Sequence, residues 1–292
     1  MMSPSSERIR REGTSGRFYL IDGVKFPSVT TILSVINKPA LVSWSAKVER
    51  EACTLAATEL YAELAPRPQL PRAMYVLALE QRLGQTKAHT KALAAAAEIG
   101  TACHSKIEWL LRRQLGQRVG PEPMGPDAVE WSVMAFEDWS KAVQIHPLAI
   151  ETTVFSRTHA YAGTLDLLAE LNGPALLTVL ERQGPVAVTL GDWLRRHDTV
   201  TACIDFKTGK QVWPESFIQA TAYVRALAEM GHGRVDGALI VRLPKLTTDP
   251  AFEVCVVPPA RDLFPVFLAA RQLWQWQFDE EQAYRAKRVA VA

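Results

Sequence analysis

The stretch "VTACIDFKTGKQVWPESFIQATAYVRALAEMG" (residues 200–231) predicts a strand followed by a helix. Its beginning is apolar and β-branched, whereas the part after Pro214 repeats apolar residues at helical spacing. Because side chains alternate along a strand, Asp205 and Lys207 project to one face and Phe206 to the other. An acid and a base side by side on an apolar strand indicate either a reactive site or a plain ion pair, and the D-x-K pattern alone leaves both open.

Further strand patterns lie on both sides of this stretch. "AIETTVFSRT" and "YAGTLDLLAEL" precede it, joined by a short His-Ala connection, and "DGALIVRL" and "FEVCVVP" follow it. Helical patterns stand before the first strand, in "DAVEWSVMAFEDWSKAVQ", and after the last, in "DLFPVFLAARQLWQWQFDEEQAYRAK". This order predicts an α/β fold with a mixed central β-sheet of about five strands flanked by helices.

The N-terminal part is expected to be a helical elaboration of that core. Residues 1–15 are expected to be a disordered tail, and "GRFYLIDGVKFPSVTTIL" predicts a hairpin around Asp22-Gly23 and a short helix capped by Ser28 or Thr30. A long helical pattern follows, interrupted by Pro66, Pro68 and Pro71. We therefore expect a tail at 1–15, a hairpin and helical region at 16–120, and a core at 121–292 with an insertion at about 172–201.

Composition excludes several classes of protein. The chain has 292 residues, 48% of them hydrophobic, and a net charge of +2, so it can bury a large core but carries no strong overall charge. Its four cysteines form no C-x-x-C pair, which argues against a zinc ribbon or a sequence-local iron–sulfur cluster. No segment has the length and apolarity of a membrane span or a signal peptide, and no nucleotide-binding Walker loop is present. We expect a cytoplasmic protein without membrane, iron–sulfur or nucleotide partners.

A second acidic residue comes one predicted strand before the D-x-K pattern. Asp166 ends "AGTLD", in which Gly163 lets another group approach the backbone closely. If the two strands are neighbours, Asp166 and Asp205 converge at one end of the sheet. Converged carboxylates repel each other, and Lys207 offsets only one charge, so a hard divalent cation such as Mg²⁺ or Mn²⁺ completes the balance.

Other polar residues recur at spacings that point to the same end of the sheet. His104 follows Gly100 by one helical turn in "EIGTACHSKIE", and Glu151 opens the first strand of the core. Gln219 and Tyr223 are four apart on the helix after Lys207. A helical histidine and tyrosine also have ordinary structural uses, and these positions alone do not exclude them.

Taken in order, G-x-x-x-H, then E with G-x-x-D, then D-x-K, then Q-x-x-x-Y resembles the PD-(D/E)XK nuclease superfamily. Within this superfamily, the motifs resemble those of the RecB-type exonuclease branch. The chain is similar to phage exonucleases and to the mitochondrial genome maintenance exonuclease. The resemblance covers roughly residues 24–245. The resemblance implies a restriction-endonuclease-like core and a metal-dependent DNA exonuclease. Such an enzyme would act at free ends, on single-stranded or tailed DNA, in repair, recombination or replication.

The resemblance also implies roles for individual residues. One or two Mg²⁺ or Mn²⁺ ions would be held by His104, Asp166, Asp205 and the backbone carbonyl of Phe206. Lys207 would be the catalytic lysine, with support from Glu151, Gln219 and Tyr223.

The chain departs from the family pattern in three places. Leu165 replaces the proline of the motif name, and the insertion at 172–201 is longer than the usual tight hairpin. The clustered cysteines of the adaptation nucleases in this branch are missing. We interpret the insertion as a flap beside the cleft.

DNA is the expected partner, with a recombination or replication protein as a further one. Charge and aromatic stacking suit a single strand, and the expected contacts are Ser28, Thr30, Lys38, Trp44, Lys47, Gln219 and Tyr223. An equally ordinary interpretation puts Trp44 in a core. Three alternative functions stay open: a structure-specific endonuclease of the same fold, a non-catalytic nucleic-acid-binding protein, and an enzyme acting on small phosphate esters.

Overall fold

The computed structural model describes residues 6–10, 16–64, 71–249, 252–257 and 262–291. The chain divides into two compact units, one formed by residues up to 36 together with those from 102 onward, the other by residues 37–101. The expected boundary near residue 120 therefore differs from the observed division. The N-terminal hairpin and the segment from 102 belong with the core, because their contacts are made there.

A five-stranded mixed sheet forms the centre of the larger unit and confirms the predicted α/β fold. Its order is β4-β5-β6-β7-β8, and only the β6–β7 pair is parallel. Helix α8 (Pro214–Glu229) is the crossover that a parallel pair requires. The strands are β4 (His146–Ser156), β5 (Tyr161–Asn172), β6 (Thr199–Lys207), β7 (Gly237–Arg242) and β8 (Glu253–Val257).

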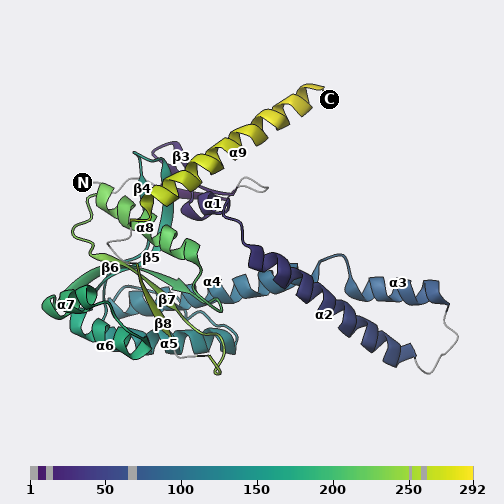
Figure 1. The fold of residues 1–292 in the computed structure, drawn as a ribbon, viewed down its shortest axis with the longest axis horizontal. Coiled ribbons are helices and arrows are strands. Elements are labelled where there is room, and N and C mark those ends of the chain that lie inside the picture. The colour runs from purple at the N-terminus through teal and green to yellow at the C-terminus, as the bar shows by residue number, and fades with distance from the viewer. Residues whose placement is uncertain (1–5, 11–15, 65–70, 250–251, 258–261, 292) are drawn as a thin grey trace. The chain divides into compact units, whose positions relative to one another are not determined.

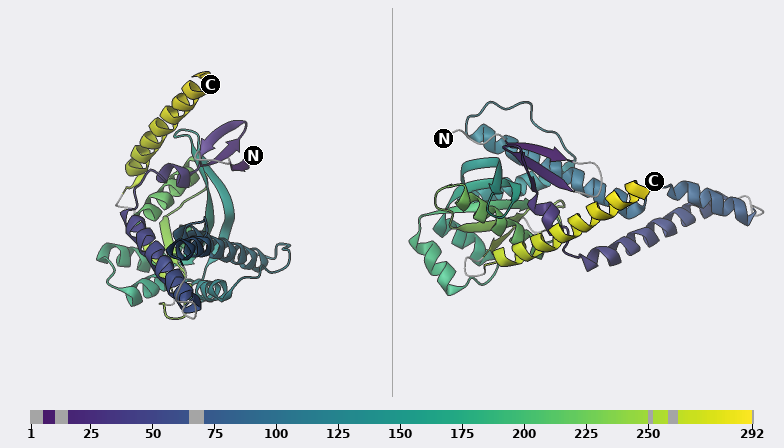
Figure 2. Two further views of the ribbon diagram at one scale, coloured as in Figure 1. Left: turned by 90° about the vertical axis from the view of Figure 1, so that its right-hand side faces the viewer. Right: turned by 90° about the horizontal axis from the view of Figure 1, so that it is seen from above.

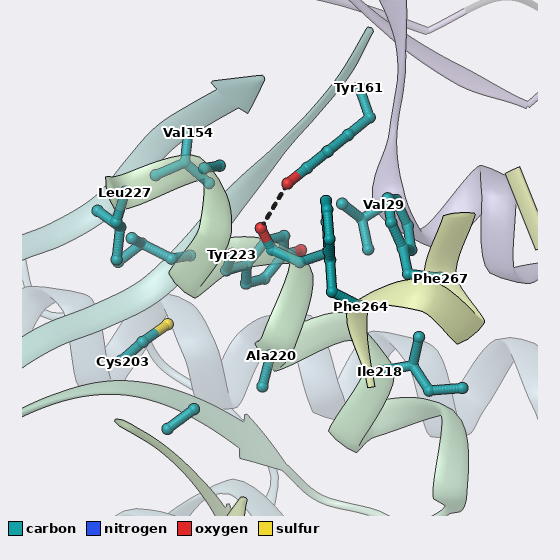
Figure 3. Close-up of a cluster of buried hydrophobic side chains, with 14 of the residues drawn as sticks. Val29, Val154, Tyr161, Cys203, Ile218, Ala220, Tyr223, Leu227, Phe264 and Phe267 are labelled. Carbon is teal, nitrogen blue, oxygen red and sulfur yellow. Dashed lines mark hydrogen bonds between the residues drawn. The ribbon is translucent and has the colours of Figure 1, made fainter. Parts of the chain in front are cut away.

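Helices cover both faces of this sheet (Figure 1). Helix α8 packs on one face, while α5 (Asp127–Val143) and α6 (Gly173–Gln183) lie on the other. On the α8 face, the helix packs between the sheet and α9 (Phe264–Val291), and Tyr161 donates a hydrogen bond to the Ala222 carbonyl at 2.8 Å (Figure 3). On the other face, Phe206 packs edge-on against Phe136 of α5. Burial on two faces explains why these strands are so uniformly apolar.

The insertion between β5 and β6 contains two helices. Asn172 accepts a hydrogen bond from the Ala175 amide at 2.9 Å and so caps α6. Helix α7 (Val188–Arg196) follows and packs against α6. The insertion therefore has its own apolar contacts.

A small N-terminal sheet packs on the turn end of β4 and β5 (Figure 2). Its strands are β1 (Ser6–Arg10), β2 (Arg17–Ile21) and β3 (Val24–Pro27). The predicted hairpin is confirmed, with Asp22 and Gly23 at φ 48° and 79° as a two-residue turn requires. Residues 6–10 pair with β2, which corrects the expected tail at 1–15, of which 1–5 and 11–15 lie outside the described residues.

Helix α1 (Val29–Leu33) begins directly after this sheet. Ser28 caps it, accepting a hydrogen bond from the Thr31 amide at 3.0 Å, so the first of the two predicted caps is confirmed. Tyr19 of β2 shares a 2.9 Å hydrogen bond with Thr164 of β5, which links the small sheet to the central one.

The smaller unit consists of helices. It contains α2 (Pro39–Leu64), α3 (Arg72–Leu83) and the beginning of α4 (Ala88–Gln114). Tyr75 donates a hydrogen bond to the Ala57 carbonyl at 3.3 Å and ties α3 to α2. Across the part of the chain that the structure describes, no helix combines the length and apolarity needed to cross a membrane.

Candidate active site

Three acidic residues lie at one level of three adjacent strands. The register of β4 on β5 places Glu151 opposite Asp166, between two regular residue pairs. The register of β5 on β6 ends at Leu167 and Ile204, one position before Asp166 and Asp205. The sequence-based expectation that β5 and β6 are neighbours and bring two aspartates together is confirmed.

Strands β5 and β6 separate at this level, and a side-chain contact takes the place of backbone hydrogen bonds between them. The Phe206 amide donates a 2.7 Å hydrogen bond to Oδ2 of Asp166 instead of to a backbone carbonyl. Glu151 has φ 45°, in the left-handed region that β-strand residues avoid. It also lies in the middle of β4 and does not open the strand as expected. Local strain of this kind persists where surrounding contacts enforce it, often at functional sites.

His104 of α4 joins two of these acids. Its Nδ1 lies 3.5 Å from Oδ1 of Asp166 and 4.0 Å from Oε1 of Glu151. The potential ligand atoms of the three residues all lie within 4.8 Å of one another, and each side chain is half-buried. A nitrogen and carboxylate oxygens at such separations could hold one divalent cation.

Asp205 forms a second cluster beside this group. It is 1% exposed, and its Oδ2 lies 2.6 Å from Nζ of Lys207. Gln219 of α8 donates a 2.7 Å hydrogen bond to Oδ1 of Asp205, while its own carbonyl oxygen lies 3.4 Å from Nζ of Lys207. The same amide donates to the Tyr223 hydroxyl at 3.3 Å. Gln219 therefore links both charged residues of the D-x-K pattern to α8.

One oxygen of Asp205 is short of hydrogen-bond donors. Among the described residues, Oδ2 is fully buried and its contact with Lys207 is an ion pair without hydrogen-bond geometry. Buried carboxylate oxygens are normally hydrogen-bonded or coordinate a metal. Among the described residues, the group of potential metal ligands is His104, Glu151 and Asp166, and Asp205 lies outside it with its Oδ2 against Lys207.

The charges in the site shift one another's pKa values. Burial favours the neutral carboxyl and, with the nearby charge of Asp166, raises the pKa of Asp205 to about 6 despite the opposing Lys207. Burial acts the same way on Asp166, but His104 and Lys207 outweigh it and lower the pKa of Asp166. Burial also disfavours a charged imidazole, yet Asp166 and Asp205 raise the pKa of His104 to about 9. Without a metal, the site thus combines several carboxylates with two cations.

The remaining predicted metal ligand, the backbone of Phe206, lies between the two clusters. Its amide binds Asp166, and its ring packs edge-on against Phe136 and Trp139 and 6.4 Å from the His104 ring. These contacts fix the backbone on which the Phe206 carbonyl sits.

The predicted DNA-contact residues are distributed over both units. Ser28 is 2% exposed and is occupied as a helix cap, whereas Thr30 is exposed. Lys38, Trp44 and Lys47 belong to the smaller unit, where Lys47 is exposed and pairs with a glutamate one turn away. The structure thus assigns Ser28 a structural role.

One residue of the site region escaped the sequence patterns. Lys245 is half-buried in the segment after β7, its pKa is lowered by burial, and it interacts electrostatically with Cys103, the neighbour of His104. Burial raises the pKa of Cys103 to about 11, so this thiol is protonated at neutral pH. No motif marks Lys245, because its position depends on the segment after β7, whose Pro244 carbonyl accepts a 2.7 Å hydrogen bond from Ser132 of α5.

No family model matches the chain, and none of the curated proteins is detectably similar to it in sequence.

Proposed function

We propose that this chain is a Mg²⁺- or Mn²⁺-dependent DNA exonuclease of the PD-(D/E)XK type, which hydrolyses phosphodiester bonds at free ends. One observation carries the proposal: Glu151, Asp166 and Asp205 lie at one level of three adjacent strands, with His104 and Lys207 beside them. Each element of the ordered motif set thereby contributes to one small region.

The residues suit a cation-assisted hydrolysis. His104, Glu151 and Asp166 would hold the ion, and Asp205 lies on the neighbouring strand with its Oδ2 against Lys207. A divalent ion bound there supplies charge stabilisation at the phosphate and a water of lowered pKa. The family resemblance implied only a supporting role for Glu151. Its proximity to His104 and Asp166 favours a role as a metal ligand.

Lys207 would act on the substrate. Its side chain is 30% exposed, whereas that of its partner Asp205 is 2% exposed. The ammonium is held by Asp205 and Gln219 at the end of a partly exposed side chain. An anchored cation can orient the attacking water or offset the negative charge that develops on the phosphate.

The test uses end-labelled single-stranded and double-stranded DNA with Mg²⁺ or Mn²⁺. The wild type is expected to release labelled nucleotides, and Asp205→Ala and Lys207→Ala are expected to lower the rate at least about a hundredfold, as loss of one transition-state contact does. Lys210→Ala, in the turn after β6, is the matched control and should retain activity. Equal digestion by all four proteins would contradict the assignment of the site.

Two further substrates separate the alternatives. Cleavage of circular DNA would identify an endonuclease of the same fold. Hydrolysis of bis(p-nitrophenyl) phosphate without any cleavage of DNA would identify an enzyme for small esters. Metal-independent DNA binding with no hydrolysis would identify a non-catalytic binding protein.

A further inference from the structure

A cavity of about 970 Å³ lies between the insertion helices α6 and α7 and the central sheet. Val200 and Ala202, near the start of β6, line the cavity, whereas Asp205 and Lys207 of the candidate active site lie at the other end of that strand. Apolar side chains from both helices and three strands line it, among them Leu180, Leu190, Trp193, Val200, Leu239 and Val254. Its size falls in the range of small-molecule sites.

The walls of this cavity are held by hydrogen bonds that need no occupant. The side-chain amide of Gln183, at the end of α6, donates to the Phe252 carbonyl at 3.2 Å and accepts from the Val254 amide at 2.9 Å. These bonds attach α6 to the edge strand β8. At the start of α6, the Gly173 amide donates to the Asp198 carbonyl at 3.1 Å and closes the base of the insertion. The cavity is therefore preformed.

An aromatic wall is fixed in the same way. The Trp193 ring stacks on His197, with centroids 4.5 Å apart and planes inclined by 25°. Gly173 lies so near the His197 carbonyl that any Cβ would overlap it, which keeps α6 close to the end of α7. Trp193 thus presents one ring face or edge to the cavity at a defined position.

The charges of the lining are already paired. Among the described lining residues, only Arg234 and Asp236 are charged, and they form an ion pair with each other. The second oxygen of Asp236 accepts a 3.0 Å hydrogen bond from the Thr201 amide. A charged ligand in this cavity would find its possible counter-ions already paired with each other. Burying its charge among apolar side chains would therefore be unfavourable.

We propose that this cavity, defined by α6, α7 and strands β6–β8, binds a small neutral molecule that is mainly hydrocarbon or aromatic. The site is separate from the candidate active site and does not depend on the proposed nuclease activity. An apolar occupant removes the surface of the cavity from water, which is the driving force for binding.

The proposal is tested with N-phenyl-1-naphthylamine, a neutral fluorophore that brightens in apolar surroundings, titrated into the full chain. We expect saturable binding at one site. Leu190→Asp places a charge in the lining and should weaken binding at least about tenfold, a loss of about 1.4 kcal/mol. Val188→Asp is the matched control, because Val188 lies on the same helix, is 76% exposed and is not part of the lining.

Competition defines the class of ligand. 1-Dodecanol should displace the fluorophore, and dodecanoate of equal chain length should do so at least about tenfold less well. Ala202→Leu fills the floor with an apolar group and should also weaken binding, which covers the case that Leu190→Asp does not fold. The proposal would be overturned by any of three results. The fluorophore does not bind saturably, folded Leu190→Asp and Val188→Asp bind it equally, or dodecanoate binds more tightly than 1-dodecanol.

Discussion

Tyr223 of α8 packs directly on the backbone of Gly163 in β5. A Cβ at position 163 would lie within 3.1 Å of the Tyr223 hydroxyl oxygen and closer still to its ring edge. The hydroxyl also accepts a hydrogen bond from Gln219, which in turn donates to Asp205. The glycine before Asp166 and the Q-x-x-x-Y pattern are therefore two halves of one contact, which sets how closely α8 approaches the acidic strands.

Gly163→Ala is expected to lower the free energy of unfolding by about 1–3 kcal/mol, the usual cost of overpacking a buried contact. The displaced tyrosine would also disturb Gln219, so activity should fall even where the variant is folded. Urea unfolding and nuclease assays measure the two effects. Gly233→Ala is the control, because no atom lies within 4 Å of its added Cβ. Equal stability of the two variants would show that the Tyr223 contact is not restrictive.

Metal binding is expected to stabilise the protein through the group of His104, Glu151 and Asp166. At a Mn²⁺ concentration of about a hundred times Kd, the native state gains about 2.7 kcal/mol. Thermal unfolding with and without Mn²⁺ should show this shift for the wild type and not for Asp166→Asn. Glu170→Gln, on the same strand, should keep the shift. A shift retained by Asp166→Asn would mean that the ion binds elsewhere.

The sequence predicted the central sheet well because its elements have strong patterns. "CIDF" and "ALIV" are apolar runs of strand length bounded by turn residues, and the helix after Pro214 has a clear helical period. The convergence of Asp166 and Asp205 followed once β5 and β6 were taken as neighbours, since register then places them side by side. Local pattern and topology were sufficient there.

Other features depend on contacts that no local pattern shows. The charged segment Ser6–Arg10 has no strand pattern of its own and forms a strand by pairing antiparallel with β2. The left-handed backbone of Glu151 occurs inside β4, between two regular pairs with β5, and nothing in the strand's sequence pattern marks it. The two units meet after residue 101, which lies inside α4 (Ala88–Gln114). The helical pattern continues across this point, so the sequence shows no change in composition there.

Lys207→Met is expected to destabilise the protein, because Asp205 then stays buried without its counter-ion. Loss of one partner of such a contact costs about 1–3 kcal/mol. The double variant Lys207→Met/Asp205→Asn should recover part of this loss, since no buried charge remains. Denaturant unfolding of four proteins, the wild type, Lys207→Met, Asp205→Asn and the double variant, forms a double-mutant cycle. Purely additive losses would show that the 2.6 Å ion pair contributes nothing to stability.

Ser28 and Thr30 are expected to respond differently to alanine substitution. Ser28 is buried and caps α1, so Ser28→Ala should cost about 1 kcal/mol of stability. Thr30 is exposed, and Thr30→Ala should change stability by less than about 0.5 kcal/mol. Thermal unfolding measures both. If Thr30→Ala were the more damaging change, the assignment of the cap would be wrong.

Glu229 is expected to make stability depend on pH in the acid range. At the end of α8 it accepts hydrogen bonds from the Ser156 hydroxyl at 2.5 Å and from the amides of Arg157 and Thr158 at 2.8 and 3.0 Å. Burial opposes its charge, but these bonds outweigh burial and lower the pKa of Glu229 below 4.5.

Because the folded-state pKa of Glu229 is lowered, its contribution is complete above about pH 4.5 and is lost as pH falls through the folded-state value. Because Glu229 is exposed and solvent screens its charge, Glu229→Gln should lower stability by about 0.5–1 kcal/mol at pH 7 and by less near pH 3. Urea unfolding across this range measures the difference from the wild type. Glu280→Gln, at an exposed position of α9, should follow the wild type at every pH. A loss from Glu229→Gln that stays constant down to pH 3 would mean that the charge of Glu229 does not fasten the β4–β5 turn to α8.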